Sequence, residues 1–152
     1  MQEVITLTDI KAAQARVNDM IAAFEAQTRS AIHLPEQIID LAAGEHYAGI
    51  IVGKDGNPSY HLILLPGQAE SVDWEDAKTW AKGVSGELPN RREQSLLYAN
   101  LKEEFDPNWY WSSEAYASSG YAWDQYFRTG GQSFSDTINE LRARAVRRLV
   151  IE

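Results

Sequence analysis

The residues best suited to ligand chemistry lie in one stretch, WYWSSEAYASSGYAWDQYF, which spans residues 109–127. It holds three of the five tryptophans and four of the seven tyrosines. Large amphipathic rings beside small hydroxyl residues are typical of recognition surfaces, because they give contact area at low entropic cost. Rings at strand spacing also build sheet cores, which is the more frequent role of any single ring. The stretch therefore has two interpretations, a ligand site and a core.

Residue types for catalysis or metal binding are sparse. The chain has no cysteine, which excludes disulfides, thiolate nucleophiles and thiolate metal sites. Its three histidines, His33, His46 and His61, have no close metal-ligand spacing and no Ser-His-Asp context. No glycine pattern for cradling phosphate precedes a helix. The sequence predicts a protein that is not an enzyme and has neither a cofactor nor a metal.

Composition and charge are those of one globular domain. The 152 residues are 44% hydrophobic and 24% charged, and the formal net charge is −8. That charge argues against nucleic-acid binding, which needs a basic face. Four arginines cluster near the end of the chain, but a strand would divide them between its two faces, so we expect salt bridges or a strand edge there. They are Arg142, Arg144, Arg147 and Arg148.

Residues 8–27 are predicted to form a helix with Thr8 as its N-cap. Apolar residues follow a 3-4 spacing, and two polar residues occupy matching positions. The apolar residues are Leu7, Ile10, Val17, Ile21 and Phe24, and the polar ones are Gln14 and Thr28. Two alternatives remain open: a short coiled coil that joins copies through residues 7–28, or an amphipathic helix packed on its own domain. A linker follows, so residues 1–34 are assigned to a helix and linker for oligomerisation or anchoring.

The rest of the chain alternates helix and strand signals. We expect a helical turn between Pro35 and Gly44, a hairpin at 47–65 around Asp55-Gly56, and a helix that begins at the N-cap Asp73. A second helix with an Asn90–Glu93 capping box should follow, and then strands at 109–113, 122–127 and 141–151 with a polar loop at 128–140. This order predicts an α+β domain with a mainly antiparallel sheet.

Five motifs occur in a fixed order within residues 48–152: W-E-D-A-K-x-W-A, G-E-L-P-N-R-R-E-Q, Y-W-S-S-E, A-W-x-x-x-F and R-A-R-A-V-R-R. In this order they resemble the Lcl C-terminal-like domain of unknown function, a family of phage and bacterial proteins. The resemblance implies a C-type-lectin-like fold for residues 35–152, with two helices flanking a sheet and an irregular loop region as the recognition face.

On this chain the recognition face would correspond to residues 114–139. The ligand-binding candidates are Tyr116, Tyr121, Trp123, Gln125, Tyr126, Arg128, Gln132 and Asp136. Alternation along 122–127 puts Trp123, Gln125 and Phe127 on one face and Ala122, Asp124 and Tyr126 on the other. We expect one of these faces to be outward, with the choice left open. Trp111 is assigned to the core.

Two activities of related folds do not carry over. The run Asp106-Pro107-Asn108 is similar to part of the calcium signature of sugar-binding C-type lectins, but it precedes a strand and no Trp-Asn-Asp run follows. The chemistry of formylglycine-generating enzymes depends on cysteines, which this chain lacks.

The resemblance implies a phage- or prophage-encoded module that binds a protein or glycan through its loop face. The alternative is a structural subunit of a phage or multiprotein assembly, held by the N-terminal helix. With no signal peptide and no membrane-length apolar run, we expect the protein in the bacterial cytoplasm or the phage particle, without membrane insertion.

Overall fold

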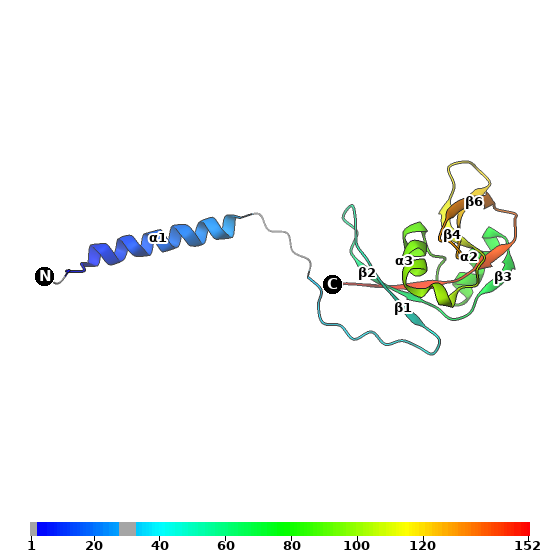
Figure 1. The fold of residues 1–152 in the computed structure, drawn as a ribbon, viewed down its shortest axis with the longest axis horizontal. Coiled ribbons are helices and arrows are strands. Elements are labelled where there is room, and N and C mark those ends of the chain that lie inside the picture. The colour runs from blue at the N-terminus through cyan, green and yellow to red at the C-terminus, as the bar shows by residue number, and fades with distance from the viewer. Residues whose placement is uncertain (1–2, 28–32) are drawn as a thin grey trace. The chain divides into compact units, whose positions relative to one another are not determined.

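The computed structural model describes residues 3–27 and 33–152, and the chain divides into two compact units, Met1–Leu34 and Pro35–Glu152. The first unit contains one helix, α1, at Leu7–Ala26 (Figure 1). Part of the expected linker, and residue 28 at the end of the expected oligomerisation segment, lie outside the described residues. None of the helices in the described ranges is long and apolar enough to cross a membrane.

The N-cap of α1 is Thr6, so the prediction of Thr8 was wrong. The Thr6 hydroxyl accepts from the Asp9 N–H at 3.2 Å, and the Asp9 carboxylate accepts from the Thr6 N–H at 2.9 Å. A capping box needs an acidic or amide side chain three residues after the cap, and Thr8 has Lys11 at that position. No residue of α1 is buried.

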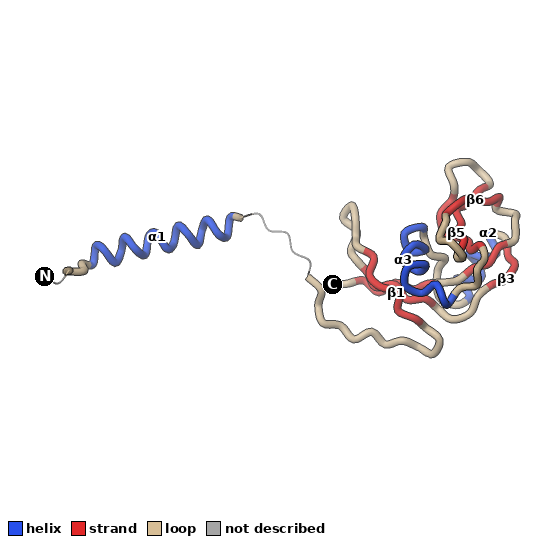
Figure 2. The backbone as a smooth tube through the Cα atoms, in the orientation of Figure 1, coloured by secondary structure: helices blue, strands red, loops and turns tan. Residues whose placement is uncertain are grey.

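The second unit is α+β, as predicted, with its strands in two mostly antiparallel sheets (Figure 2). The first sheet has the order β1-β2-β8, with β1 at His46–Ile51, β2 at Tyr60–Leu64 and β8 at Val146–Val150. The second sheet has the order β3-β7-β4-β5-β6. Its strands are β3 at Ala69–Val72, β7 at Leu141–Ala143, β4 at Trp109–Ala115, β5 at Tyr121–Tyr126 and β6 at Gln132–Asp136. The pair β4–β7 is parallel, and the other described pairs are antiparallel.

Both helices of this unit begin where their caps predict. α2 at Trp74–Gly83 starts after Asp73, whose carboxylate accepts from the Asp76 N–H at 2.8 Å. α3 at Arg91–Leu101 starts after Asn90 with a complete Asn90–Glu93 capping box, and a short 3₁₀ turn, η1 at Lys102–Glu104, follows it. The predicted hairpin is confirmed as β1–β2. These elements are set by signals only a few residues long.

The hydrophobic core has two parts that lie on opposite faces of β4 and β5. One joins α3 and the three-stranded sheet to Tyr110 and Phe127, and Phe105 stacks on Phe127 with ring centroids 3.9 Å apart. The other joins α2 to Trp111 and Ala122. The assignment of Trp111 to the core is confirmed, since none of its surface is exposed.

In the middle of β5 both faces are covered, so the expectation of one outward face was wrong there. Asp124 from one face and Gln125 from the other are both completely buried. Gln125 donates to the Gln94 backbone carbonyl at 2.9 Å, and the Asp124 carboxylate accepts from the Ser135 hydroxyl. Strand alternation identified the two faces but could not show that helices cover both.

Three other predicted elements differ from the structure. Residues 33–42 form no helix; Arg147 holds this segment through the Asp40 carbonyl at 3.0 Å and the Glu45 carboxylate at 2.7 Å. The expected loop at 128–140 contains the edge strand β6, whose polar sequence is ordered by pairing with β5. The expected strand at 141–151 is two strands, β7 and β8, which belong to different sheets.

The chain changes sheets at Arg144, which explains this break. Its side chain is buried, and the guanidinium donates to the backbone carbonyls of Leu65, at 2.8 Å, and Glu104. Burial lowers the pKa of Arg144. The other three arginines form the predicted salt bridges: Arg142 with Asp106, Arg147 with Glu45, and Arg148 with Glu87 and Glu93.

Asp124 predicts a stability change with pH. Burial raises the pKa of its carboxyl, with the Ser135 hydrogen bond acting in the opposite direction, and its Oδ1 atom has no protein partner. A pKa above the unfolded value means that the folded state binds the proton more tightly. This contribution is therefore fully present below the unfolded pKa of about 3.9 and is lost as the pH rises through the folded pKa.

We expect Asp124→Asn to remove this contribution. As the pH falls from about 7 to about 3, the unfolding free energy of the native chain should rise relative to that of the variant, as measured by urea unfolding at each pH. Ser135→Ala should strengthen the dependence, because the hydroxyl lowers the pKa of Asp124. Parallel pH profiles for the native chain and Asp124→Asn would contradict the assignment.

Candidate functional site

Four aromatic side chains form a cluster at one end of the five-stranded sheet, here called the aromatic patch: Tyr116, Tyr121, Trp123 and Phe134. Trp123 of β5 pairs with Phe134 of the edge strand β6. Tyr116 stacks on Phe134 with centroids 3.9 Å apart and planes at 17°, and meets Trp123 edge-on at 5.1 Å. Tyr121 meets Phe134 edge-on at 5.8 Å. The four rings thus contact one another, although they come from three consecutive segments: the β4–β5 loop, β5 and β6.

A short loop places Tyr116 in this cluster. The residues between β4 and β5 are only 116–120, fewer than the eight residues, 114–121, that separate the two strands expected from the sequence. The Tyr116 N–H donates to the Tyr121 carbonyl at 2.9 Å, which closes the loop. Gly120 has a φ of +87°, a conformation that glycine adopts at low cost. The turn therefore returns the chain directly into β5.

Arg91, the first residue of α3, covers one side of the patch. Its guanidinium carbon lies 3.5 Å from the centroid of the Trp123 ring, a cation–π contact. Its Nε donates to the Gln132 side-chain oxygen at 3.0 Å, and the Gln132 amide donates back to the Arg91 carbonyl at 2.8 Å. Arg91 is thereby held between α3 and β6.

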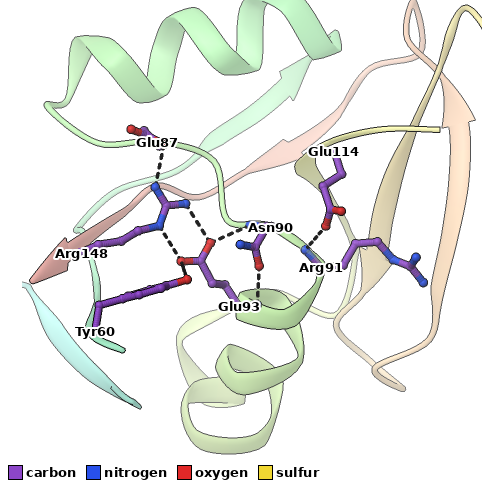
Figure 3. A network of polar contacts seen from close by, with 7 residues as sticks. All are labelled: Tyr60, Glu87, Asn90, Arg91, Glu93, Glu114 and Arg148. Carbon is purple, nitrogen blue, oxygen red and sulfur yellow. Dashed lines mark hydrogen bonds and ion pairs between the residues drawn. The ribbon is translucent and has the colours of Figure 1, made fainter. Parts of the chain in front are cut away.

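An open groove of about 530 Å³ adjoins Arg91. The Glu114 carboxylate at its wall accepts from the Arg91 backbone N–H at 2.6 Å (Figure 3). A carboxylate is favoured there, because the N-terminus of a helix carries partial positive charge. The groove thus presents cationic, anionic, amide and hydroxyl groups beside the aromatic patch. Its lining residues are Asn90, Arg91, Arg92, Ser95, Glu114 and Gln132.

A buried ion pair lies at the start of α3, next to Asn90 and Arg92, which line this groove. Glu93 is fully buried, and its two oxygens accept from Arg148 at 2.7 and 2.8 Å. They also accept from the Tyr60 hydroxyl and the Asn90 N–H, each at 2.8 Å. Figure 3 shows the Arg148 guanidinium between Glu93 and Glu87, which lies 2.6 Å from it. The network ties the start of α3 to β2 and β8.

The structure brings part of the predicted site together and separates the rest. Tyr116, Tyr121 and Trp123 belong to the aromatic patch, Asp136 pairs with Tyr121 at its edge, and Gln132 lines the groove. Three other predicted residues lie elsewhere. Gln125 is buried, Tyr126 stacks on Trp109 at the far end of β5 with centroids 4.8 Å apart, and Arg128 is exposed beyond that end.

The inclusion of Gln125 as a ligand contact was therefore wrong, because α3 covers it. Tyr126 and Arg128 cannot share one small site with Tyr121, since a strand rises about 3.3 Å per residue and β5 separates its two ends by roughly 17 Å. The side chains at the start of α3 were not predicted. The Asn90–Glu93 capping box located this helix terminus, but nothing in the spacing placed it beside Trp123.

Two of the histidines have structural partners: His46 lies 3.3 Å from Glu104, and His61 lies 2.8 Å from the Tyr47 hydroxyl. Within residues 3–27 and 33–152, no group of three or more His, Cys, Asp or Glu side chains could hold a metal ion. No protein-family model matches the chain, and a comparison with curated proteins finds no match.

Proposed function

We propose that this protein is a non-enzymatic ligand-binding module, encoded by a phage or prophage, that recognises a protein or glycan. The binding unit is 35–152, with a C-type-lectin-like scaffold of the Lcl C-terminal-like kind. Its ligand contacts the aromatic patch and the adjoining groove. The main support for this proposal is the position of Arg91, which contacts the Trp123 ring and also lines a groove of polar side chains.

The chemistry of the patch suits such a ligand. Tyr121 and Phe134 are 39% and 44% exposed, so their rings offer apolar area to a sugar face or a side chain. Arg91, Glu114 and Gln132 beside them supply donors and acceptors for hydroxyl or amide groups. An apolar surface with a few convergent polar groups is the usual composition of a binding site.

Alanine variants test this assignment once a ligand is found by screening a glycan array and a set of bacterial surface proteins. We expect Tyr121→Ala, Phe134→Ala and Arg91→Ala each to weaken binding about tenfold or more, because aromatic and arginine anchors dominate recognition. Binding would be measured by calorimetry on the full chain. The matched controls are Tyr126→Ala and Arg128→Ala, at the far end of β5, which should bind normally.

The partner is identified by the class of ligand whose binding the patch variants weaken. Weakened binding of a glycan hit assigns the patch to sugar, and weakened binding of a protein hit assigns it to protein. If the patch variants bind as well as the native chain while Tyr126→Ala or Arg128→Ala bind poorly, the site lies at the opposite end of β5. If all five variants bind every hit unchanged, the proposed site is wrong.

A further inference from the structure

The helix α1 exposes an apolar stripe that one polar residue, Gln14, interrupts. Leu7, Ile10, Val17 and Ile21 are 66%, 57%, 49% and 51% exposed, and no residue of the helix is buried. Most helical stability in proteins comes from packing an amphipathic face rather than from the helix alone. We therefore expect the stripe to pack against another apolar surface of similar length.

The spacing of the stripe is that of a coiled coil. With Leu7 at position a of a heptad, Ile10 and Val17 fall at d, and Gln14 and Ile21 fall at a. The opposite face, at positions b, c and f, is polar or small and contains Thr8, Asp9, Ala12, Ala15, Arg16, Asp19, Ala22 and Ala23. An a/d seam is complementary to another copy of itself, which identifies further copies of this chain as the partner.

We propose that α1 joins three copies of the chain in a parallel coiled coil. β-branched residues at d disfavour two-stranded bundles, and Leu at a with Ile at d favours larger ones, as in Leu7 and Ile10. The g positions hold Ala13 and Met20, which widen the apolar face beyond the narrow seam of a dimer. Both features select more than two helices. The polar e positions limit the apolar face to one flank of the seam, which fits three helices better than four; they are Lys11, Asn18 and Glu25.

Gln14 determines the direction of the helices. In a parallel bundle the Gln14 side chains of all copies meet in one layer and can hydrogen-bond to one another. In an antiparallel bundle that aligns the a and d layers, Gln14 lies opposite Val17, so its amide is buried against a methyl surface. Burial of an amide without a partner is unfavourable. The parallel arrangement satisfies this layer.

A trimer extends the proposed function without depending on it. Each copy brings its own unit 35–152, and therefore its own aromatic patch. Linking binding units raises the effective concentration for the second and third contacts, so a multivalent surface would be held more tightly than a single ligand. The oligomer forms through α1 whatever the ligand is.

The first test is the mass of the full chain in solution by sedimentation equilibrium. The expected species is about 51 kDa, three times the 17.1 kDa of one chain, across about 1–100 µM. Val17→Asp at position d should shift the distribution to monomers. The matched control is Ala12→Asp at position f, which places the same residue on the outer face and should remain trimeric.

Folding of the variants can be followed separately. All five tryptophans lie in 35–152, so tryptophan fluorescence and near-ultraviolet circular dichroism report on that unit alone. A Val17→Asp monomer with a native tryptophan spectrum supports assembly by α1. A native chain that is a monomer, dimer or tetramer across this range overturns the trimer, as does a Val17→Asp variant that stays trimeric.

The absence of cysteine allows a direct test of direction. Leu7→Cys introduces a single thiol near the start of the helix, where parallel copies bring position 7 of each chain together. The second variant is Phe24→Cys, near the end of the helix. Mild oxidation of a mixture of the two variants should give disulfides between chains of the same variant only. In the antiparallel alignment residue 7 lies opposite residue 24, so a disulfide between the two different variants would contradict the parallel arrangement.

Discussion

Arg148→Met is expected to destabilise the fold by about 3–5 kcal/mol, because it removes one partner of a buried ion pair and leaves the other charged and buried. Glu93 has no exposed surface, and Arg148 supplies two of its hydrogen bonds. Hydrogen bonding to Glu93 also raises the pKa of Arg148, so the guanidinium is charged at any ordinary pH. For a chain of this size the loss should lower the Tm by roughly 6–20 °C.

Glu93→Gln should cost less than Arg148→Met. In that variant the guanidinium keeps its contact with Glu87 and part of its exposure to water, and no buried charge is left alone. The double variant Glu93→Gln/Arg148→Met should be more stable than Arg148→Met, since the isolated carboxylate is gone. Urea unfolding followed by tryptophan fluorescence measures all three.

A matched surface pair serves as the control. Arg142 and Asp106 lie 2.6 Å apart, but the Asp106 side chain is 53% exposed, so Arg142→Met should cost at most about 1 kcal/mol. If Arg148→Met and Arg142→Met destabilise the protein equally, the buried pair is no more important for stability than the surface pair.

Trp111→Ala is the second large expected effect, with a loss of about 3–5 kcal/mol. The ring is completely buried among the residues that join α2 to the five-stranded sheet, and its Nε1 donates to the Val72 carbonyl at 2.9 Å. Truncation removes apolar contacts, opens a cavity and leaves that carbonyl without its donor. Thermal unfolding by circular dichroism would show the loss as a lower Tm.

Two comparison variants separate these contributions. Trp111→Phe retains most of the ring but no donor, so it should cost about 1–3 kcal/mol, less than the alanine variant. Phe134→Ala removes an exposed ring of the aromatic patch and should cost about 1 kcal/mol or less. A Trp111→Ala protein as stable as the native chain would show that the site can refill from neighbouring side chains.

Signals contained within a few residues predicted the fold well. The Asp73 cap, the Asn90–Glu93 capping box and the Asp55-Gly56 turn each located an element that the structure contains. Each works through hydrogen bonds or backbone conformations among near neighbours in sequence. The cap of α1 was misplaced by two residues because Thr6 and Thr8 are both suitable, and only Thr6 has Asp9 in the reciprocal position.

Elements that depend on distant partners were missed. The polar strand β6 has little strand signal of its own and exists through its pairing with β5. The division of the last strand follows from Arg144, whose carbonyl partners are Leu65 and Glu104. A single-sequence pattern contains no information on which distant carbonyls a side chain will reach.

The candidate site likewise has features set by local sequence and features set by packing. The sequence by itself determined that aromatic residues gather at 109–127, that Trp111 belongs to the core, and that α1 has a 3-4 apolar spacing, since composition and periodicity are local properties. Only the tertiary structure decided which rings form the patch, because α3 covers Gln125 and brings Arg91 onto Trp123. Burial and contact between segments far apart in the chain result from packing, which no local pattern specifies.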